Sequence, residues 1–440
     1  MCKGSVPATN SLNHHAARPS RTAGRLGMSQ IDPRRLIEPQ AYADLGYPHE
    51  EWATLRREEP VAFFEPEGWS PFWAVTKHQD IVEISKQPQK FSNQPSATFM
   101  PSRDEQQNEL RKQIRTIIDM DLPDHRDYRK IVSASFSPRA IARLTPVVQK
   151  VATQLVDGLG SEGEADLIPD FASIHPLKAV CHLLGVPEED ESKILRLTNE
   201  LFGNADPEFQ RGEEVNENMK ALFMEFWSYF GELLADRRAN PREDLLSVFA
   251  NAKVKGEPMP ELETLGYCLV AFTAGHETTR GGIGGGLQIL SERPDLLKQW
   301  AKNLDKSRLA IDEIIRYVTP VTHMMRTALT DYQLGDKQIK AGDTLVMFYA
   351  SANRDEDVFE AAEEIRLDRH PNPHVAFGVG EHFCIGSHLA RLTSGTLFRE
   401  LVSRLELLEP AGQPERTASN LVPGFKHLPL RYRLAPSPRT

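Results

Sequence analysis

The chain has 440 residues, 40% of them hydrophobic, and a formal net charge of −10. This length is enough for a large core, and the negative charge argues against nucleic acid as a partner. Four cysteines without paired spacing exclude a disulfide framework or a CxxC site and fit a reducing cytoplasm, and the sequence has no run of about 18 apolar residues that could insert in a membrane.

The chain reads as one domain preceded by an extension. Residues 1–27 are rich in Ser, His, Arg and Ala without an apolar period, which predicts a disordered N-terminal extension or a mis-assigned start ahead of Met28. No spacer rich in Gly, Ser or Pro interrupts residues 28–440, so we expect them to form a single domain.

Apolar residues recur at spacings of three and four in five segments, which predicts helices. These segments are Ile141 to Leu159, Met219 to Leu234, Leu262 to Leu290, Leu309 to Tyr317 and Ser387 to Leu405. Strand-like stretches are few: Val61 to Phe64, Phe72 to Val75, Thr344 to Phe348 and the tail around Leu430 to Leu434. This balance predicts a mainly α fold with small β-sheets.

The segment from Leu269 to Thr279 places a carboxylate, Glu277, inside a long apolar helical pattern. A buried carboxylate is costly unless it has a partner or a task. At helical spacing the small residues of this segment form one stripe, which a helix crossing a flat ligand requires. The stripe consists of Ala271, Ala274, Gly275, Thr278 and Gly282. Five glycines between positions 281 and 286 weaken the helix, and we expect close packing against neighbouring elements to explain them.

Cys384 lies in a loop punctuated by glycines, Phe377 to Gly386, which runs into a predicted helix. Most lone cysteines are buried small hydrophobes, and Cys2, Cys181 and Cys268 fit that description. A helix N-terminus stabilises a thiolate, the form of cysteine that binds metal, so Cys384 is a candidate metal ligand.

Three motifs in chain order resemble those of the cytochrome P-450 family, the haem-thiolate monooxygenases. The Cys384 loop has every fixed position of the pattern Phe-Gly-x-Gly-x-His-x-Cys-x-Gly, and residues 274–279 resemble the oxygen-binding motif Ala/Gly-Gly-x-Asp/Glu-Thr-Thr. Glu313 and Arg316 match the ExxR pair. The resemblance runs from about Ile31 to Leu434 and implies the cytochrome P-450 prism fold in one domain.

The resemblance implies a haem b cofactor whose iron is bound by the Cys384 thiolate. It also implies that the two haem propionates are bound by His125, Arg129, Arg326 and His382, and that the haem contacts Phe377, Gly378, Gly386, Ala274 and Gly275. Glu313 and Arg316 are expected to form a structural ion pair. The arginine that completes this pair in relatives has no clear match here, and Arg366 or Arg369 is expected to take its place.

By the same resemblance, Glu277 and Thr278 are the catalytic residues, which relay protons to dioxygen as its O–O bond breaks. Glu277 stands where many relatives have Asp. His276, at the variable position of the motif, is expected to be a packing or solvent-facing residue.

The stretches that line the substrate pocket in the family are mostly apolar here, which predicts a lipophilic substrate. They include Met120, Val270, Ala271, Val321, Thr322, His323, Met324, Leu421 and Val422. Residues 201–204, 320–322 and 420–426 look similar to bacterial members that oxidise terpenoids and steroid side chains. The resemblance therefore favours a terpenoid or steroid.

Electrons are expected from an external ferredoxin and its reductase, because the chain has neither a flavin motif nor an iron–sulfur cysteine set. A local basic face for the ferredoxin is predicted at Arg111, Lys112, Arg115, Arg126 and Arg129. We expect a monomer. Two other functions stay open: a peroxide-driven or isomerising haem-thiolate enzyme, and a non-catalytic haem-binding sensor. A proton relay would be superfluous in either.

Overall fold

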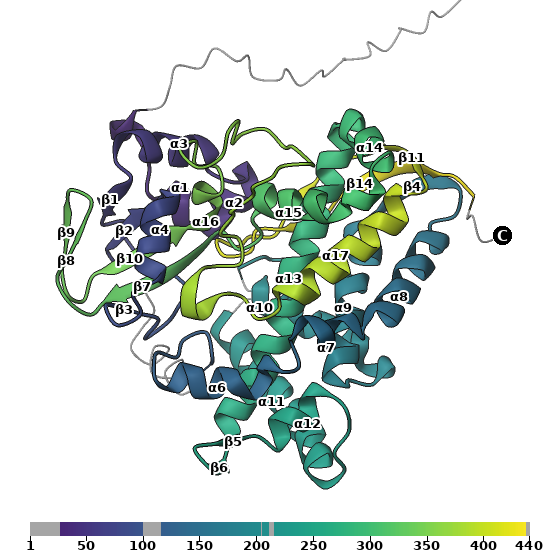
Figure 1. Cartoon of the computed structure of the whole chain (residues 1–440), viewed down its shortest axis with the longest axis horizontal. Helices are drawn as coiled ribbons and strands as arrows, with labels where there is room; N and C mark the ends of the chain where they lie inside the picture. Colours follow the sequence, from purple (N-terminus) through teal and green to yellow (C-terminus); the bar gives the residue numbers. More distant parts are fainter. Residues whose placement is uncertain (1–26, 100–115, 204, 211–214, 437–440) are drawn as a thin grey trace, which may run out of the picture.

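The computed structural model describes residues 27–99, 116–203, 205–210 and 215–436. The predictions for residues 1–26 and for the basic residues Arg111, Lys112 and Arg115 fall outside these ranges. Within them the protein is rich in helices and has five small sheets, as the sequence predicts (Figure 1).

The helices are α1 (Arg34–Ile37), α2 (Pro39–Leu45), α3 (His49–Glu58), α4 (His78–Ser85), α6 (Asp124–Ser133), α7 (Pro138–Ala142), α8 (Thr145–Gly158), α9 (Ile174–Leu184), α10 (Glu191–Phe202), α11 (Val215–Ala239), α12 (Leu245–Ala250), α13 (Glu261–Glu292), α14 (Pro294–Ala301), α15 (Ser307–Val318), α16 (Tyr349–Ala352) and α17 (Ser387–Val402). The strands are β1 (Val61–Phe64), β2 (Phe72–Val75), β3 (Phe91–Ser92), β4 (Glu162–Asp166), β5 (Lys253–Val254), β6 (Glu257–Pro258), β7 (His323–Ala328), β8 (Tyr332–Leu334), β9 (Lys337–Ile339), β10 (Thr344–Phe348), β11 (Leu405–Pro410), β12 (Glu415–Arg416), β13 (Phe425–His427) and β14 (Pro429–Leu434).

One predicted helix is wrong. The segment from Ile141 to Leu159 forms two helices, α7 and α8, because Pro146 lies in the first turn of α8. Proline has no backbone N–H and clashes with the preceding turn, so it can begin a helix but cannot continue one. At the other end of the chain, α17 stops at Val402 rather than Leu405, where β11 begins.

The strands gather into one larger sheet and several small ones. The larger sheet has the order β1-β2-β10-β7-β3, and a three-stranded sheet has the order β11-β14-β4. Figure 1 shows the larger sheet at one side of the molecule and most of the long helices at the other. A short segment joins the helical part to this sheet, because α15 ends five residues before β7 begins.

Helix α13 crosses the helical part of the fold and packs against α9, α10, α15 and α17. Its glycines permit this packing, as predicted. A Cβ at Gly285 would come 2.6 Å from a methyl carbon of Val318, and one at Gly286 would come 2.5 Å from the ring of Phe398. Real Cβ atoms do not approach other atoms so closely, so both neighbours depend on glycine.

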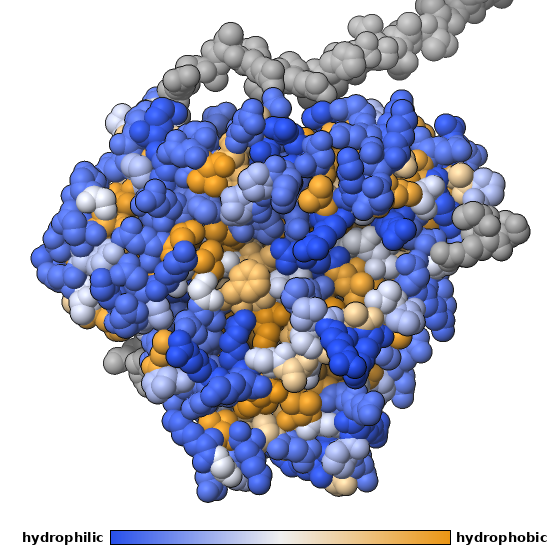
Figure 2. Space-filling model, viewed as in Figure 1, coloured by the Kyte–Doolittle hydropathy of each residue, from blue (hydrophilic) through white to orange (hydrophobic). Residues whose placement is uncertain are grey.

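Hydrophilic side chains cover most of the face drawn in Figure 2, while hydrophobic ones gather near its middle. Among the described residues, no helix combines the length and the apolar character that a membrane span requires.

The β12–β13 hairpin fixes the segment that follows α10. The Nδ1 atom of His427 lies 2.5 Å from Oδ2 of Asp166, and its Nε2 atom lies 3.1 Å from Oε1 of Glu208. Both ring nitrogens can donate only in the charged imidazolium. Burial alone would lower the pKa of His427, but the hydrogen bond to Asp166 and the charge of Glu208 outweigh it and raise the pKa. The Lys426 ammonium, 3.1 Å from Glu208, helps to balance these carboxylates.

The substitution His427→Gln is expected to lower the free energy of unfolding by about 1 kcal/mol at pH 6, the size of a partly exposed ion pair. Because the folded-state pKa is raised, this stabilisation is fully present below the unfolded pKa of about 6.5 and is lost as the pH rises through the folded value. Urea unfolding of the parent protein and the variant at pH 6 and at pH 9 measures the free-energy difference at each pH. The exposed His182 supplies a matched control, His182→Gln, with little effect at either pH. An equal loss at both pH values for His427→Gln would contradict the ion-pair explanation.

Candidate active site

Cys384 ends a tight loop that leads into α17. The loop contains the short 3-10 turn η5 (Gly380–His382), and the Cys384 N–H donates to the Phe377 carbonyl at 2.8 Å. Gly378 and Gly380 have φ angles of 70° and 77°, which favour glycine. At Gly380 a Cβ would also come 2.5 Å from the backbone oxygen of Ser85. The glycine spacing of the motif thus has a steric cause in this fold.

The thiol of Cys384 lies where a negative charge is stabilised. Burial raises its pKa, whereas the backbone N–H groups of Gly386 and Ser387 and the charges of Arg129 and Arg391 lower it. The N–H groups belong to the first turn of α17, where no carbonyl of the helix accepts from them. A metal cation on the sulfur would remove the remaining cost of the buried thiolate.

Protein surrounds Cys384 closely enough to raise its pKa, yet its side chain is accessible to solvent. On α13, Ala274 is exposed and Gly275 and Thr278 are half-buried, although Glu277 between them is fully buried. A reachable sulfur and a strip of small residues on α13 fit a large flat group such as haem.

Glu277 points to the buried side of α13. Its Oε1 atom accepts a hydrogen bond from Arg280, one turn later, and Arg280 donates in turn to Oδ1 of Asn199 on α10 at 2.9 Å. Burial raises the pKa of Glu277, and the Arg280 guanidinium acts against this shift. Thr278 lies beside it with its hydroxyl donating to the Ala274 carbonyl at 2.8 Å.

The predicted propionate ligands include two that lack an anionic partner. Arg326 on β7 is buried and donates to the Met325 carbonyl at 2.8 Å, and it forms no ion pair with a carboxylate of the described residues. The buried Nδ1 atom of His125 has no partner either, and the ring of His125 stacks on that of His382 at 4.0 Å. Arg129 donates to the Phe383 carbonyl at 2.6 Å. A buried guanidinium without a counter-ion is costly, and a haem propionate would supply one.

The predicted pocket residues divide by exposure. Those that keep accessible surface are Val270, Ala271, Val321, Met324 and Leu421, whereas Met120, Thr322, His323 and Val422 are buried. The Thr322 N–H donates to the Leu421 carbonyl at 3.0 Å, so the start of β7 is bound to the C-terminal turn. Thr322 therefore holds these two segments together, and the five residues of the set that keep accessible surface are all apolar.

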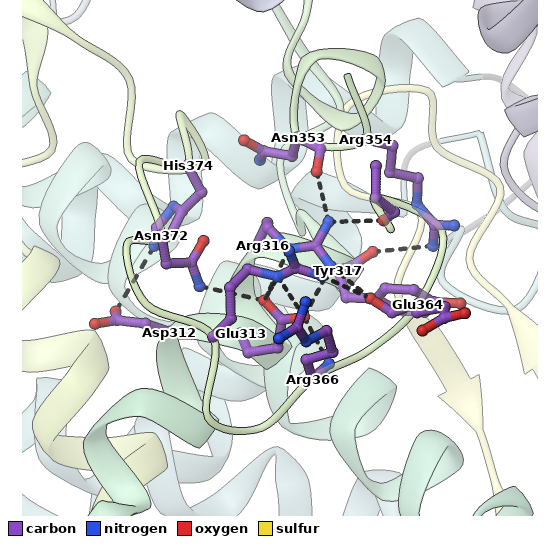
Figure 3. Close-up of polar contacts among 12 residues, drawn as sticks. Asp312, Glu313, Arg316, Tyr317, Asn353, Arg354, Glu364, Arg366, Asn372 and His374 are labelled. Carbon is purple, nitrogen blue, oxygen red and sulfur yellow. Dashed lines mark hydrogen bonds and ion pairs between the residues drawn. The ribbon is translucent and has the colours of Figure 1, made fainter. Parts of the chain in front are cut away.

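Figure 3 shows the ion-pair network around Glu313. Arg316 donates to both carboxylate oxygens of Glu313 at 2.8 Å, and both residues are fully buried. Arg369 completes the network, with its Nε atom 3.0 Å from each of the same oxygens. Arg366 contributes only its backbone N–H, at 2.8 Å, while its side chain extends toward Glu360. Of the two arginines expected here, the structure selects Arg369.

This network fixes the start of the Cys384 loop. Arg316 donates to the Asn353 carbonyl at 2.7 Å, and the side-chain oxygen of Asn353 accepts the Val375 N–H at 2.7 Å. Val375 lies two residues before Phe377, at which the loop begins. The buried ion pair is thus connected to the sulfur by two consecutive hydrogen bonds and a short stretch of backbone.

Sequence reasoning missed Arg280 as the partner of Glu277. The signal was present, because an arginine three residues after an acid on one helix repeats the spacing of Glu313 and Arg316.

Comparison with known proteins shows which family the chain resembles. The family model described as Cytochrome P450 matches residues 62–435. The chain is 36% identical to Cytochrome P450-terp of a Pseudomonas species, over 91% of this chain and 97% of the relative, and 35% identical to a Steroid C26-monooxygenase of Mycolicibacterium smegmatis, over 88% and 90%. The crystal structure of CYP108D1 from Novosphingobium aromaticivorans superposes with a TM-score of 0.82 at 36% identity, over 91% of this chain and 98% of that one.

Proposed function

Because the chain belongs to the cytochrome P450 family and is a haem-thiolate monooxygenase, we propose that it inserts one oxygen atom of dioxygen into a C–H bond of a terpenoid or steroid. The observation that carries this proposal is the accessible Cys384 sulfur at the N-terminus of α17, together with the exposed Ala274 on α13. In this arrangement Cys384 would bind the haem iron, and the buried Arg326 would bind a propionate.

The haem, when bound, supplies the activation of dioxygen, which thiolate ligation favours. The chain's own part is to deliver protons and exclude water. Glu277 is fully buried, and burial raises its pKa while the Arg280 guanidinium opposes that shift, so its carboxyl is the group of this helix suited to take up and release a proton. Thr278 lies next to it on the accessible side of α13 and can pass that proton on from its hydroxyl oxygen.

A lipophilic substrate is supported by the side chains that keep accessible surface. Val270, Ala271, Val321, Met324 and Leu421 are all apolar, and they come from three segments that meet near α13. Apolar pockets with few polar groups bind apolar ligands. One relative is a Steroid C26-monooxygenase, which favours a substrate as large as a steroid.

We assign the electron supply to an external ferredoxin. A surface cavity of about 570 Å³ beside the Cys384 loop is lined by Lys86, Arg126 and Arg129 among others, with Glu381 as an acidic neighbour. The hydrophobic middle of the face in Figure 2, within a hydrophilic rim, is the composition of a protein-binding surface. An acidic ferredoxin would complement the basic side chains.

The relay is tested by Thr278→Ala and Glu277→Gln in the holoenzyme, with the terpenoid or steroid that gives the largest low-spin to high-spin shift. Each variant is expected to lower the fraction of reducing equivalents recovered in hydroxylated product by about 10-fold or more, because a positioned proton donor contributes at least that much. The remaining electrons leave as hydrogen peroxide or water, so peroxide and oxygen are measured together.

Thr279→Ala is the matched control. Its hydroxyl makes the same kind of intrahelical bond, to the Gly275 carbonyl at 3.1 Å, but on the buried side of α13. Thr279→Ala should keep the recovery of product near that of the parent enzyme. Full recovery in both Thr278→Ala and Glu277→Gln would contradict the relay.

A further inference from the structure

Three polar side-chain atoms from residues within about one turn of α13 are buried without a hydrogen-bond partner. They are Nδ1 of His276, Oε2 of Glu277 and Nε of Arg280. His276 and Glu277 have no exposed surface, and Arg280 has almost none. A buried polar atom left unpaired costs stability, and three in one place indicate a shared partner that is not a protein side chain.

The bonds of the other atoms define what each of the three can do. The Nε2 atom of His276 lies 3.1 Å from the Ser173 carbonyl, which can only accept, so Nε2 carries the proton. Burial, and then the charge of Arg280, lower the pKa of His276 to about 3, so the ring is neutral and Nδ1 is an acceptor. Oε2 of Glu277 is a second acceptor, and Nε of Arg280 is a donor.

Two of these atoms face each other at a distance that one molecule of water spans. His276 Nδ1 and Glu277 Oε2 are 4.0 Å apart, which is too long for a direct hydrogen bond. Two acceptors and one donor are the complement of a water molecule, which donates twice and accepts from a third group. Buried waters typically make about three hydrogen bonds of this kind.

We propose that His276, Glu277 and Arg280 hold one internal water, and that His276 acts through this water as a positioning residue for the Glu277 carboxyl. The proposal rests on the proton relay of the proposed function. Arg280 and Asn199 hold one oxygen of Glu277 from the α10 side, and the water on His276 holds the other. The carboxyl is then fixed at both oxygens, and a proton lost from Glu277 can be replaced from the water beside it.

The charged and titratable groups around the water are few. Arg280 and Glu277 come from α13 itself, and the groups opposite them are the neutral side chain of Asn199 on α10 and the backbone carbonyl of Ser173 before α9. The bond to Ser173 uses only Nε2, so it does not account for the buried Nδ1 atom, which is costly without a partner of its own.

Two substitutions separate the positioning role from a structural one. Gln at position 276 places an amide where Nε2 lies and keeps the Ser173 bond, but it lacks an atom at Nδ1. Asn places an amide at Nδ1 and loses the Ser173 bond. We expect His276→Gln to keep the thermal unfolding midpoint while lowering product recovery about 5-fold. His276→Asn is expected to lower the thermal unfolding midpoint while keeping product recovery.

If His276 had only a structural role, stability and product recovery would change together in both variants. That result would overturn the proposal. A high-resolution crystal structure of the holoenzyme supplies an independent measurement. It should show an ordered water within hydrogen-bond distance of Nδ1 and Oε2, and a dry site would also overturn the proposal.

The Glu277→Gln background distinguishes this proposal from the relay on which it rests. If Glu277→Gln alone leaves product recovery unchanged, the relay itself fails. If Glu277→Gln lowers recovery, His276→Gln should add less than about 2-fold in that background, because residues that act through one another are not additive. An additive effect would leave the relay standing and overturn the role of His276.

Discussion

Replacing Cys384 with alanine is expected to abolish thiolate ligation of the haem completely. The sulfur is the only side-chain atom of residues 377–386 that combines an accessible position with the N–H groups of a helix N-terminus. The other two thiols of the part of the chain that the structure describes, Cys181 and Cys268, are buried in the packing around α9 and α13 and cannot replace it. The measurement is the Soret band of the reduced protein under carbon monoxide, which is strongly red-shifted only when the iron carries a thiolate.

Cys181→Ala is the control for general damage to the fold. Burial raises the pKa of the Cys181 thiol to about 12, so it stays protonated and cannot act as a ligand. This variant should keep the red-shifted band, with at most some loss of stability from the small cavity. If the band persisted in Cys384→Ala, the assignment of the ligand would be wrong, and the proposed monooxygenase reaction would lose its basis.

The sequence predicts most of the fold because its elements have strong local signals. The strands β1, β2 and β10 have the predicted bounds, since each is a short apolar run bordered by turn residues. The long apolar period of α13 is equally clear, and its glycines pack as expected. The break between α7 and α8 was missed because the apolar period continues across Pro146, whose effect is on the backbone and not on hydrophobicity.

The site is predictable where a motif fixes the spacing and less so where distant residues meet. Cys384, Glu277 and the Glu313–Arg316 pair follow from local patterns. The choice between Arg366 and Arg369 does not, because both lie in an irregular segment after α16 whose path depends on tertiary contacts. His276 illustrates the same limit, since its second role depends on an unpaired nitrogen that only the three-dimensional arrangement reveals.

Arg369→Ala is expected to lower the free energy of unfolding by about 3–5 kcal/mol, the cost of removing one partner from a buried ion network. Glu313 is fully buried and shares its charge with Arg316 and Arg369. Arg369 also donates to the Glu360 carbonyl at 2.7 Å, and its loss removes this hydrogen bond as well, whereas the Glu364 carbonyl keeps its second donor, Arg316. Because the network is connected through Asn353 to Val375, the Cys384 loop should loosen with it.

Arg366→Ala is the control that tests whether the large loss of stability in Arg369→Ala comes from the side-chain bond to Glu313. Arg366 uses only its backbone N–H for Glu313, which alanine retains, and its exposed side chain lies 3.5 Å from Glu360. Its removal should change stability by no more than about 0.5 kcal/mol. Urea unfolding and haem retention, measured for both variants, should therefore differ sharply between two arginines three residues apart. Equal effects would mean that the carboxylate of Glu313 is satisfied by Arg316 alone, and that Arg369 acts only through the backbone segment it binds.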